Sequence, residues 1–566
     1  MAYSIPGSLC STLLRRRGRL AALPFLLFLF AILLGAVKFH RAEIHRQTAE
    51  AASAEQRGRF GGTYRRSLAN APGTLDPARI NDIYARTIAQ QIYDGLVQYD
   101  ESLGIRPAIA RSWKSSRDGR IWTFFLRKGV KFHNGREVTA QDFVYSFSRL
   151  LDPKLQSAAA QFFLRIEGAR EFAEGRAKTV RGLQALDRYT LQIRLSDASS
   201  PFVPLLAIGY AKVVPKEAIE SRTQPFDLQP VGTGPFKLVH RDGNNLIVLE
   251  ANPDYFGGRP YLHRIEYKIF PAEVHEEVFL RFERGELEDS PVPAKVRSSL
   301  LKNTRYQFVR RPIMGIRFLA FNTSQKPLND LRLRRAMNYA VDREWIAKEI
   351  YQGKYNPAGS ILPPGTYSYD PNLLPYPYDP EKARRMLAQA GYPNGKGLPL
   401  LTIWSSVKYK EATEELKAIT RYLAAVGIKA EIRYNTKWPD FKRNVYAGKL
   451  PIFRYSWYGL TPDPENFLYR LFHSQSVDNF TRFHNSRIDN LLLKAASEPD
   501  PIKGVNLYRQ VEREILAEAP ILLMGYYSYE RLFQPYVKGI KVSPFGDPYI
   551  PMKDIWLEKK ANSNAR

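Results

Sequence analysis

Few residues of this chain are spaced for covalent chemistry. Ser405 and Lys408 satisfy the Ser-x-x-Lys pattern of penicillin-interacting enzymes, but the sequence contains neither of the partner motifs, Ser-Asp-Asn and Lys-Thr-Gly. It also lacks Gly-x-Ser-x-Gly and the glycine patterns that bind nucleotide phosphates. We therefore predict no catalytic residue, and any ATP hydrolysis linked to this chain must belong to a partner.

Metal-binding and redox patterns are missing as well. The 8 histidines form no His-Glu-x-x-His motif, and only His40 and His45 lie close together in the sequence. The single cysteine, Cys10, excludes an intrachain disulfide and a zinc site built from cysteines. We expect no metal and no cofactor. His133, in a Phe-His-Asn-Gly turn, is interpreted as a structural polar group.

The charge balance is strongly basic, with 84 Lys and Arg against 56 Asp and Glu and a net charge of +28. Such a balance raises the possibility of nucleic-acid binding. However, the basic residues are spread singly along the chain, and the one triple, Arg15–Arg17, is explained by membrane topology. We expect a solvated basic surface near anionic lipid and no nucleic acid as partner.

The amino-terminal region carries an export signal of some kind. Residues 20–37 are uncharged and mostly apolar, and Arg15–Arg17 precede them, which holds the amino terminus in the cytoplasm. The run is long enough to span a membrane, so it is either an uncleaved anchor or a cleaved signal. Ala52-Ser53-Ala54 resembles a cleavage site, but it lies well beyond the run with basic residues in between. We favour the uncleaved anchor.

Local patterns predict an alternation of strands and helices. Residues 121–127 and 130–133 are short runs rich in aromatic and β-branched side chains, which predicts two short strands. Thr139, followed three positions later by Asp142, forms a capping-box pattern that predicts a helix from about residue 140. A helix is also predicted at Ile80–Tyr99.

The second half of the chain continues the alternation. We predict a strand at Ile316–Phe321, a helix that begins after Asp330, and a helix that starts at Asp379-Pro380 and ends before Gly391. Further along, we predict a helix at Glu411–Val426, a strand at Ile428–Tyr434, a helix at Leu507–Ala519 and a returning strand at Ile521–Tyr529. This order is typical of an α/β protein.

Several longer motifs resemble one family. Residues 107–151 contain A-R-x-W, S-x-D-G, W-T-F-x-L-R-x-G-V-K-F-H-x-G and T-A-x-D in this order, and further matching stretches are Val231–Phe236, Asn252–Gly258, Arg332–Arg343 and Tyr378–Gly391. Together they cover roughly residues 60–558. The chain therefore resembles the extracytoplasmic solute-binding proteins of the peptide and nickel group, the dipeptide- and oligopeptide-binding proteins that serve ABC importers.

The resemblance implies a fold and a domain plan. The fold would be a two-lobed periplasmic-binding-protein-like α/β fold of type II, with an extra subdomain in lobe I and a transmembrane or signal helix before it. The implied domains are an amino-terminal region at 1–58, lobe I at 59–312 with its inserted subdomain at about 81–204, lobe II at 313–524, a return to lobe I at 525–558 and a tail at 559–566.

The resemblance also implies a function. The chain would capture a peptide or peptide-like solute outside the cytoplasm and deliver it to ABC permease subunits that work with a separate ATPase subunit. It would not be an enzyme, and residues 20–37 would anchor it in the inner membrane. There are two alternatives. One is a membrane-tethered ligand sensor or assembly protein with the same fold, and the other is a serine hydrolase, which the missing motifs disfavour.

The segment Arg454–Phe467 (RYSWYGLTPDPENF) resembles the cleft strand of this family, against which a peptide lies extended. The resemblance assigns the following ligand-binding residues: Asn70, Ala71, Arg454, Tyr455, Trp457, Tyr458, Gly459 and Leu460. Arg454 matches an arginine that meets the ligand's carboxylate in some oligopeptide-binding members. Leu460 stands where peptide-binding members have an aspartate that pairs with the ligand's amino terminus. The alternative is an ordinary half-buried strand in which Trp457 and Leu460 are packing residues.

Overall fold

The computed structural model describes residues 59–558 except 81, 198–201, 221–224, 244, 271–274, 294–295, 301, 303–304 and 499. Residues 61–557 form one compact unit, and the rest of the chain, described only at residues 59, 60 and 558, forms another. The predicted apolar segment at 20–37 lies outside the described residues. Within the described residues, no helix combines the length and the apolar composition needed to cross a membrane.

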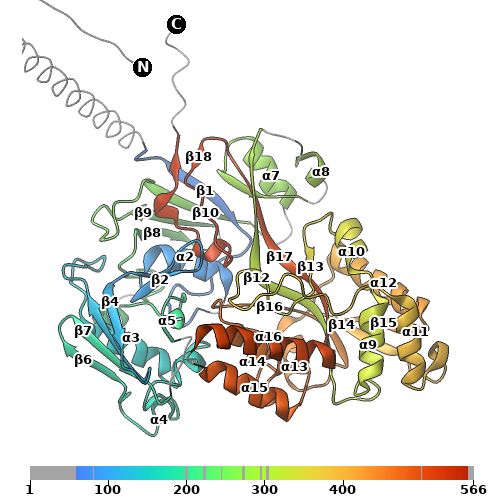
Figure 1. Ribbon diagram of the computed structural model, residues 1–566. Coiled ribbons are helices and arrows are strands. Elements are labelled where there is room, and N and C mark those ends of the chain that lie inside the picture. The colour runs from blue at the N-terminus through green and yellow to red at the C-terminus, as the bar shows by residue number, and fades with distance from the viewer. Residues whose placement is uncertain are drawn as a thin grey trace, which may run out of the picture. The chain divides into compact units, whose positions relative to one another are not determined.

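A four-stranded sheet organises the first part of the compact unit (Figure 1). Its strand order is β1-β10-β9-β8, in which β1 is parallel to β10 and the other neighbours are antiparallel. The bounds are β1 Thr63–Leu68, β8 Phe236–Asp242, β9 Leu246–Ala251 and β10 Arg264–Ile269. The elements that follow β1 are α2 Ile83–Ile92, β2 Val97–Tyr99 and β3 Ile105–Pro107.

A second four-stranded sheet, β4-β5-β7-β6, is antiparallel throughout. Its bounds are β4 Ala110–Ser115, β5 Ile121–Leu126, β6 Leu183–Asp187 and β7 Thr190–Arg194, and it is accompanied by α3 Ala140–Leu151 and α4 Ala169–Ala173. The capping box of Thr139 and Asp142 is present, so the predicted start of α3 is confirmed.

The predicted strand at residues 130–133 is wrong. Only an isolated bridge joins Lys131 to Glu137. The Phe132 N–H donates to the Arg136 carbonyl and the Gly135 N–H donates to the Phe132 carbonyl, with Gly135 at φ 89°. Because the chain turns back within residues 132–136, the two arms of this turn are too short to pair as β-strands.

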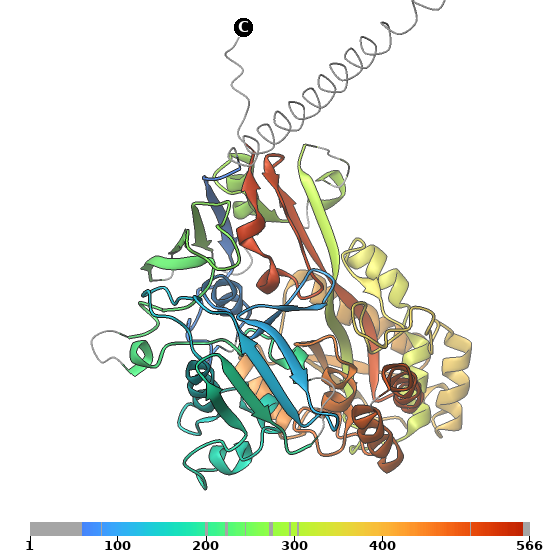
Figure 2. The same ribbon diagram turned by 60° about the vertical axis from the view of Figure 1, so that its left-hand side comes forward.

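A seven-stranded mixed sheet organises the second part, with the order β11-β17-β12-β16-β14-β15 and β13 paired with β17. The bounds are β11 Asp289–Pro291, β12 Gln307–Phe321, β13 Asn356–Pro357, β14 Leu401–Ser405, β15 Ala430–Tyr434, β16 Ile452–Tyr458 and β17 Ile521–Phe533. The long strands β12 and β17 run antiparallel beside each other, which Figure 2 shows in green and red. Their register shifts between Pro312 and Ile316 and again between Arg317 and Phe318.

Helices pack around this mixed sheet (Figure 1). They are α9 Leu331–Ala340, α10 Arg343–Trp345, α11 Pro380–Gln389, α12 Lys410–Ala425, α13 Trp438–Tyr446, α14 Leu468–Phe472, α15 Ser486–Ser497 and α16 Pro501–Glu518. Shorter elements elsewhere are α5 Phe202–Leu205, α6 Lys216–Glu220, α7 His275–Glu283, α8 Arg297–Leu300, β18 Val537–Lys538 and β19 Trp556–Leu557. Asp330 and Asp379 cap α9 and α11 through their side chains, as the sequence predicts.

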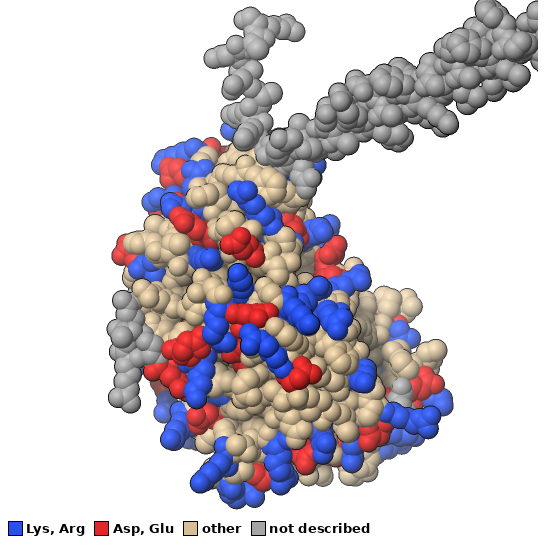
Figure 3. Space-filling model, turned by 90° about the vertical axis from the view of Figure 1, so that its left-hand side faces the viewer, with Lys and Arg blue, Asp and Glu red and all other residues tan. Residues whose placement is uncertain are grey.

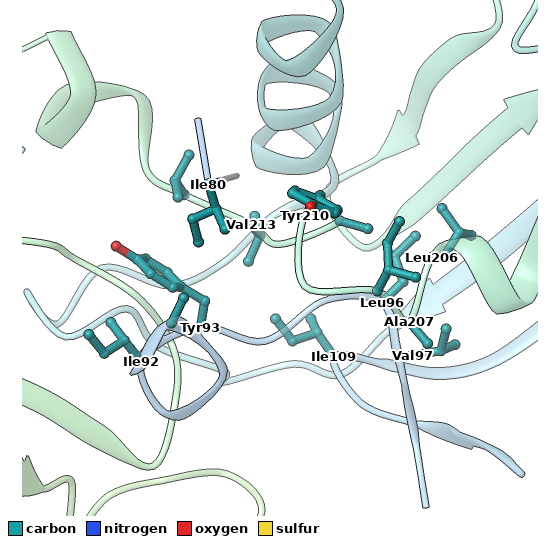
Figure 4. Close-up of a cluster of buried hydrophobic side chains, with 14 of the residues drawn as sticks. Ile80, Ile92, Tyr93, Leu96, Val97, Ile109, Leu206, Ala207, Tyr210 and Val213 are labelled. Carbon is teal, nitrogen blue, oxygen red and sulfur yellow. The ribbon is translucent and has the colours of Figure 1, made fainter. Parts of the chain in front are cut away.

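The buried apolar side chains separate into clusters that follow the sheets. One cluster joins residues 64–267 to residues 529–555, and Figure 4 shows part of it around Ile92, Tyr93 and Leu96. Two others lie on opposite faces of the mixed sheet and draw almost wholly on residues 314–526. Because side chains alternate along a strand, Phe318 of β12 belongs to one face and Leu319 to the other.

Candidate functional site

Strand β16 has a partly unpaired edge. It pairs with β12 along its whole length, but β14 pairs with it only at Ile452 and Phe453. Among the described residues, no strand adjoins residues 454–458 on that side. Unpaired backbone N–H and C=O groups can accept an extended chain as an added strand. The predicted aromatic strand is thus confirmed, and it has the geometry of a peptide-pairing edge.

The predicted site residues on β16 divide between the two faces of the sheet. Arg454 and Tyr458 share one face with Ser456, whereas Tyr455 and Trp457 point to the other face. Tyr455 belongs to one core cluster and Trp457 packs against it. A single ligand lying on the Arg454 face therefore meets alternate residues of this strand.

Arg454 lies in a buried ionic cluster that the sequence did not predict. Its Nε donates to Oε2 of Glu415 at 2.9 Å, and its Nη2 donates to the Tyr409 hydroxyl at 3.3 Å. Nε of Arg317 lies 3.1 Å from Oε1 of the same Glu415. The side chains of Arg454, Arg317 and Glu415 are only 7%, 2% and 1% exposed. Two guanidinium groups thus share one carboxylate, which leaves an excess of positive charge.

The cluster stays ionised because its members support one another. Burial by itself would raise the pKa of Glu415, but Arg317, Arg454 and their hydrogen-bonded neighbours lower that pKa below its usual value. Burial likewise opposes the charge on Arg317, yet Glu415 and nearby tyrosines raise the pKa of this guanidinium. The Tyr351 hydroxyl donates to Glu415 at 2.9 Å.

Tyrosine rings enclose Arg317. Its guanidinium carbon lies 4.3 Å from the ring centroid of Tyr351 and 4.0 Å from that of Tyr355. Its Nη1 makes no hydrogen bond within the described residues. The available sequence signal was an arginine inside the otherwise apolar strand IRFLAF, while Glu415 gave only the weaker signal of a carboxylate on the buried face of α12.

Tyr458 is the accessible member of the same sheet face, with 48% of its surface exposed. Its ring lies 5.1 Å from the ring of Tyr527, whose hydroxyl is 2.6 Å from Oγ of Ser456. Gly315 of β12 is the register partner of Tyr458, and a Cβ at Gly315 would lie 2.7 Å from two carbons of the Tyr458 ring. Gly315 therefore makes room for this tyrosine.

Trp457 is held firmly on the opposite face. Its Nε1–H donates to the Asn466 carbonyl at 2.7 Å, and the Arg470 guanidinium lies 5.3 Å from its ring centroid. The ring of Phe480 contacts it at 6.1 Å. These contacts make Trp457 a packing residue that orients the 454–467 segment.

The remaining predicted residues lie in loops. Leu460 is half-buried against the first core cluster, and its N–H donates to Oδ1 of Asn466 at 3.4 Å. Gly459 is packed so closely that a Cβ there would be 2.7 Å from the Phe467 ring. Asn70 is exposed and Ala71 half-buried in the loop after β1. Within the described part of the chain, no hydrogen bond or ion pair joins these two residues to β16.

His133 has the structural role that its turn predicts. Its Nδ1 accepts the Gly232 N–H at 3.3 Å, so its Nε2–H donates to the Gly234 carbonyl at 3.0 Å. Burial lowers its pKa to about 4, which keeps the ring neutral. Across the residues with described positions, no three His, Cys, Asp or Glu side chains are grouped to hold a metal ion.

On the face shown in Figure 3, Lys and Arg side chains are interspersed with Asp and Glu side chains.

Comparisons with known proteins agree with this geometry. The family model described as bacterial extracellular solute-binding proteins, family 5 middle, matches residues 104–479. The chain is 30% identical to the heme-binding protein A of Haemophilus influenzae over 88% of this chain and 92% of that protein. It is 28% identical to the dipeptide-binding protein of Escherichia coli over 80% of this chain and 87% of that protein.

Solved structures lead to the same family. The murein tripeptide binding protein of Escherichia coli superposes with a TM-score of 0.74 at 28% identity, over 88% of this chain and 98% of that one. A periplasmic binding protein of Helicobacter pylori, solved with the peptide STSA, superposes with a TM-score of 0.75 at 26% identity, over 89% of this chain and 100% of that one. The chain belongs to the bacterial extracellular solute-binding proteins of family 5, the peptide and nickel group.

Proposed function

We propose that this chain is the extracytoplasmic substrate-binding component of an ABC importer and that it captures a peptide or peptide-like solute. The observation that carries the proposal is the unpaired edge of β16 at residues 454–458, which offers backbone groups to an extended ligand. Relatives named for dipeptides and murein tripeptide support it. No observation favours a ligand sensor or a hydrolase.

The ligand would lie between two lobes. We assign lobe I to residues 59–312 with an inserted subdomain at about 81–204, lobe II to residues 313–524, and a return to lobe I at 525–558. The separate core clusters support these boundaries, because the clusters around the mixed sheet draw almost wholly on residues 314–526. The lobes would be joined through β12 and β17, whose register shifts near Pro312 and Arg317 provide places to bend.

Each proposed site residue has a role in this arrangement. Arg454 and Tyr458 would face the ligand on one side of the sheet, while Tyr455, Trp457 and Gly459 hold the strand and its loop in place. Leu460 would border one end of the ligand, and Asn70 and Ala71 would approach it from lobe I. The excess positive charge beside Arg454 favours a ligand that carries an acidic group.

Mass spectrometry of the ligand released from purified, denatured protein tests the proposal. We expect peptides or peptide-like solutes to be recovered. A Gly315→Ala variant is the matched comparison, because its added methyl group would displace Tyr458 and should reduce the amount of recovered ligand. Recovery of only non-peptide compounds, at equal amounts from both proteins, would contradict the proposal.

We further propose that residues 20–37 remain as an inner-membrane anchor. The reason is that Ala54 lies well beyond the end of this apolar run, and that the basic residues Lys38, Arg41 and Arg46 lie between the two. Amino-terminal sequencing of the protein from the membrane fraction is expected to give a start before residue 20. A mature start near Glu55 in a soluble periplasmic protein would show that the segment is a cleaved signal.

A further inference from the structure

A second buried carboxylate, Asp463, lies in the loop that follows β16. Only 6% of its surface is exposed. One oxygen, Oδ1, accepts the Glu465 N–H at 2.8 Å, which caps the short helical turn Pro464–Asn466. Arg454 and its neighbours belong to the ligand site described above, whereas Asp463 has no role in that site. Its burial therefore calls for a separate explanation.

The groups around Asp463 come from both proposed lobes. The charges of Glu465 and Arg165 shift the pKa of Asp463. The charge of Asp463 in turn raises the pKa of three tyrosines, Tyr99, Tyr367 and Tyr508. Tyr99 and Arg165 belong to lobe I and the others to lobe II. Burial raises the pKa of all three tyrosines, that of Tyr367 to about 12, so they stay neutral near pH 7.

Direct contacts join the two proposed lobes at Glu465 and Arg470, which follow Asp463 in the chain. Nη2 of Arg165 lies 3.3 Å from Oε1 of Glu465. Nη2 of Arg470 donates to Oε1 of Gln161 at 3.4 Å, and its guanidinium lies 5.0 Å from the ring centroid of Phe162. A cavity of about 250 Å³ between residues 161–165 and 465–478 is lined by these same side chains. The three contacts form an interface between segments some 300 residues apart.

The ionised form of the Asp463 carboxyl group is disfavoured in this interface. Burial and the nearby Glu465 carboxylate raise its pKa to about 7, against the opposing effects of the Glu465 N–H and Arg165. Separation of the lobes would remove Tyr99 and Arg165 and admit water. The carboxyl group would then return towards the ordinary pKa of an exposed aspartate, about 3.9.

We propose that the interface between residues 161–165 and 463–470 is a proton-coupled latch, in which Asp463 takes up a proton when the lobes close. The latch rests on the proposed function only in assuming that the two lobes move. Because the closed arrangement binds the proton more tightly, closure is favoured as the pH falls below about 7. Between pH 8 and pH 6 the ratio of closed to open molecules should rise roughly tenfold, with little change above pH 8.

Distances between the lobes can be measured in the full chain without ligand. Fluorophores are attached to cysteines at the exposed positions Lys178 and Lys494 in a Cys10→Ser background, and single-molecule energy transfer is recorded from pH 5.5 to pH 8.5. We expect the closed fraction to rise as the pH falls. Asp463→Asn, which mimics the neutral carboxyl, should keep the closed fraction high and remove this pH dependence.

Glu465→Gln is the second variant. It removes the negative charge next to Asp463 and also the ion pair with Arg165, so the closed fraction should fall and the midpoint of closure should move to lower pH, while the pH dependence remains. An unchanged closed fraction over the pH range in the parent protein, or the same pH dependence in Asp463→Asn, would overturn the latch. No ligand is added in these measurements, so such a failure would leave the solute-binding proposal untouched.

Discussion

Glu415→Gln is expected to lower the free energy of unfolding by about 3–5 kcal/mol, the range for removing one partner of a buried ion pair. The reason is the charge count of the cluster, since Arg317 and Arg454 would remain buried without any carboxylate. The substitution would also replace one carboxylate oxygen with an NH2 group, whereas Oε2 of Glu415 now accepts hydrogen bonds from both Arg454 and Tyr351. Chemical denaturation, followed by the fluorescence of the tryptophans near the mixed sheet, measures the effect.

Two further variants make this measurement specific. Glu414→Gln removes the neighbouring carboxylate, whose side chain is 44% exposed and pairs with Lys417 at 3.0 Å, and should change stability by about 0.5 kcal/mol or less. Arg317→Met leaves Arg454 and Glu415 as a balanced pair, so it should cost less than Glu415→Gln. If Glu415→Gln proves no more harmful than Glu414→Gln, the cluster does not carry the charges inferred for it.

Free-amine peptides are expected to bind this protein roughly 30-fold to several-thousand-fold more weakly than peptides with a blocked amino end. The range corresponds to about 2–5 kcal/mol for a buried ammonium left without its partner. The prediction follows from Leu460, a half-buried apolar residue at the position where the family resemblance implies an aspartate. It concerns the ligand's end only, and an acidic group elsewhere in the ligand would still be favoured beside Arg454.

Calorimetry with tri-alanine and acetyl-tri-alanine measures this preference. Leu460→Asp should reverse it in favour of the free amine, and Leu460→Asn, which has a similar size but no charge, is the matched control that should not. If the native protein binds tri-alanine at micromolar affinity or better and acetylation weakens binding, another residue supplies the negative charge.

Helix starts were predictable because the signals are local. Asp330 and Asp379 cap α9 and α11 where the sequence places them, and the Thr139 capping box begins α3. The helix predicted at Leu507–Ala519 begins earlier, at Pro501, where Asp500 and Pro501 form an equally good local signal. In each case the capping residues mark the start of the helix.

Tertiary contacts explain the elements that the sequence did not predict. The helix predicted at Ile80–Tyr99 is wrong in its second half, because α2 ends at Ile92 and β2 begins at Val97. Gly95 lies between them, where a Cβ would come 2.5 Å from the Ala211 carbonyl. This close approach to a distant segment leaves no periodic trace in the sequence.

The candidate site shows the same limit. The sequence motif identified Arg454 and the aromatic strand around it, and the strand is present. It could not show that Arg317 of β12 and Glu415 of α12 meet Arg454, because strand pairing and helix packing bring the three together. The sequence motif also does not show that Trp457 and Arg454 occupy opposite faces of the sheet, because that follows only once both residues are placed in one continuous strand.

The ion pair between Arg66 and Asp547 has a consequence for the order in which the chain folds. These residues are 481 positions apart, at 2.7 Å, and Arg66 is also near Asp289 in the first core. A chain exported from its amino terminus presents Arg66 early and Asp547 almost last. The core cluster around residues 64–267 therefore stays incomplete until residues 529–555 arrive, whereas the two clusters of the mixed sheet can assemble from nearly contiguous sequence.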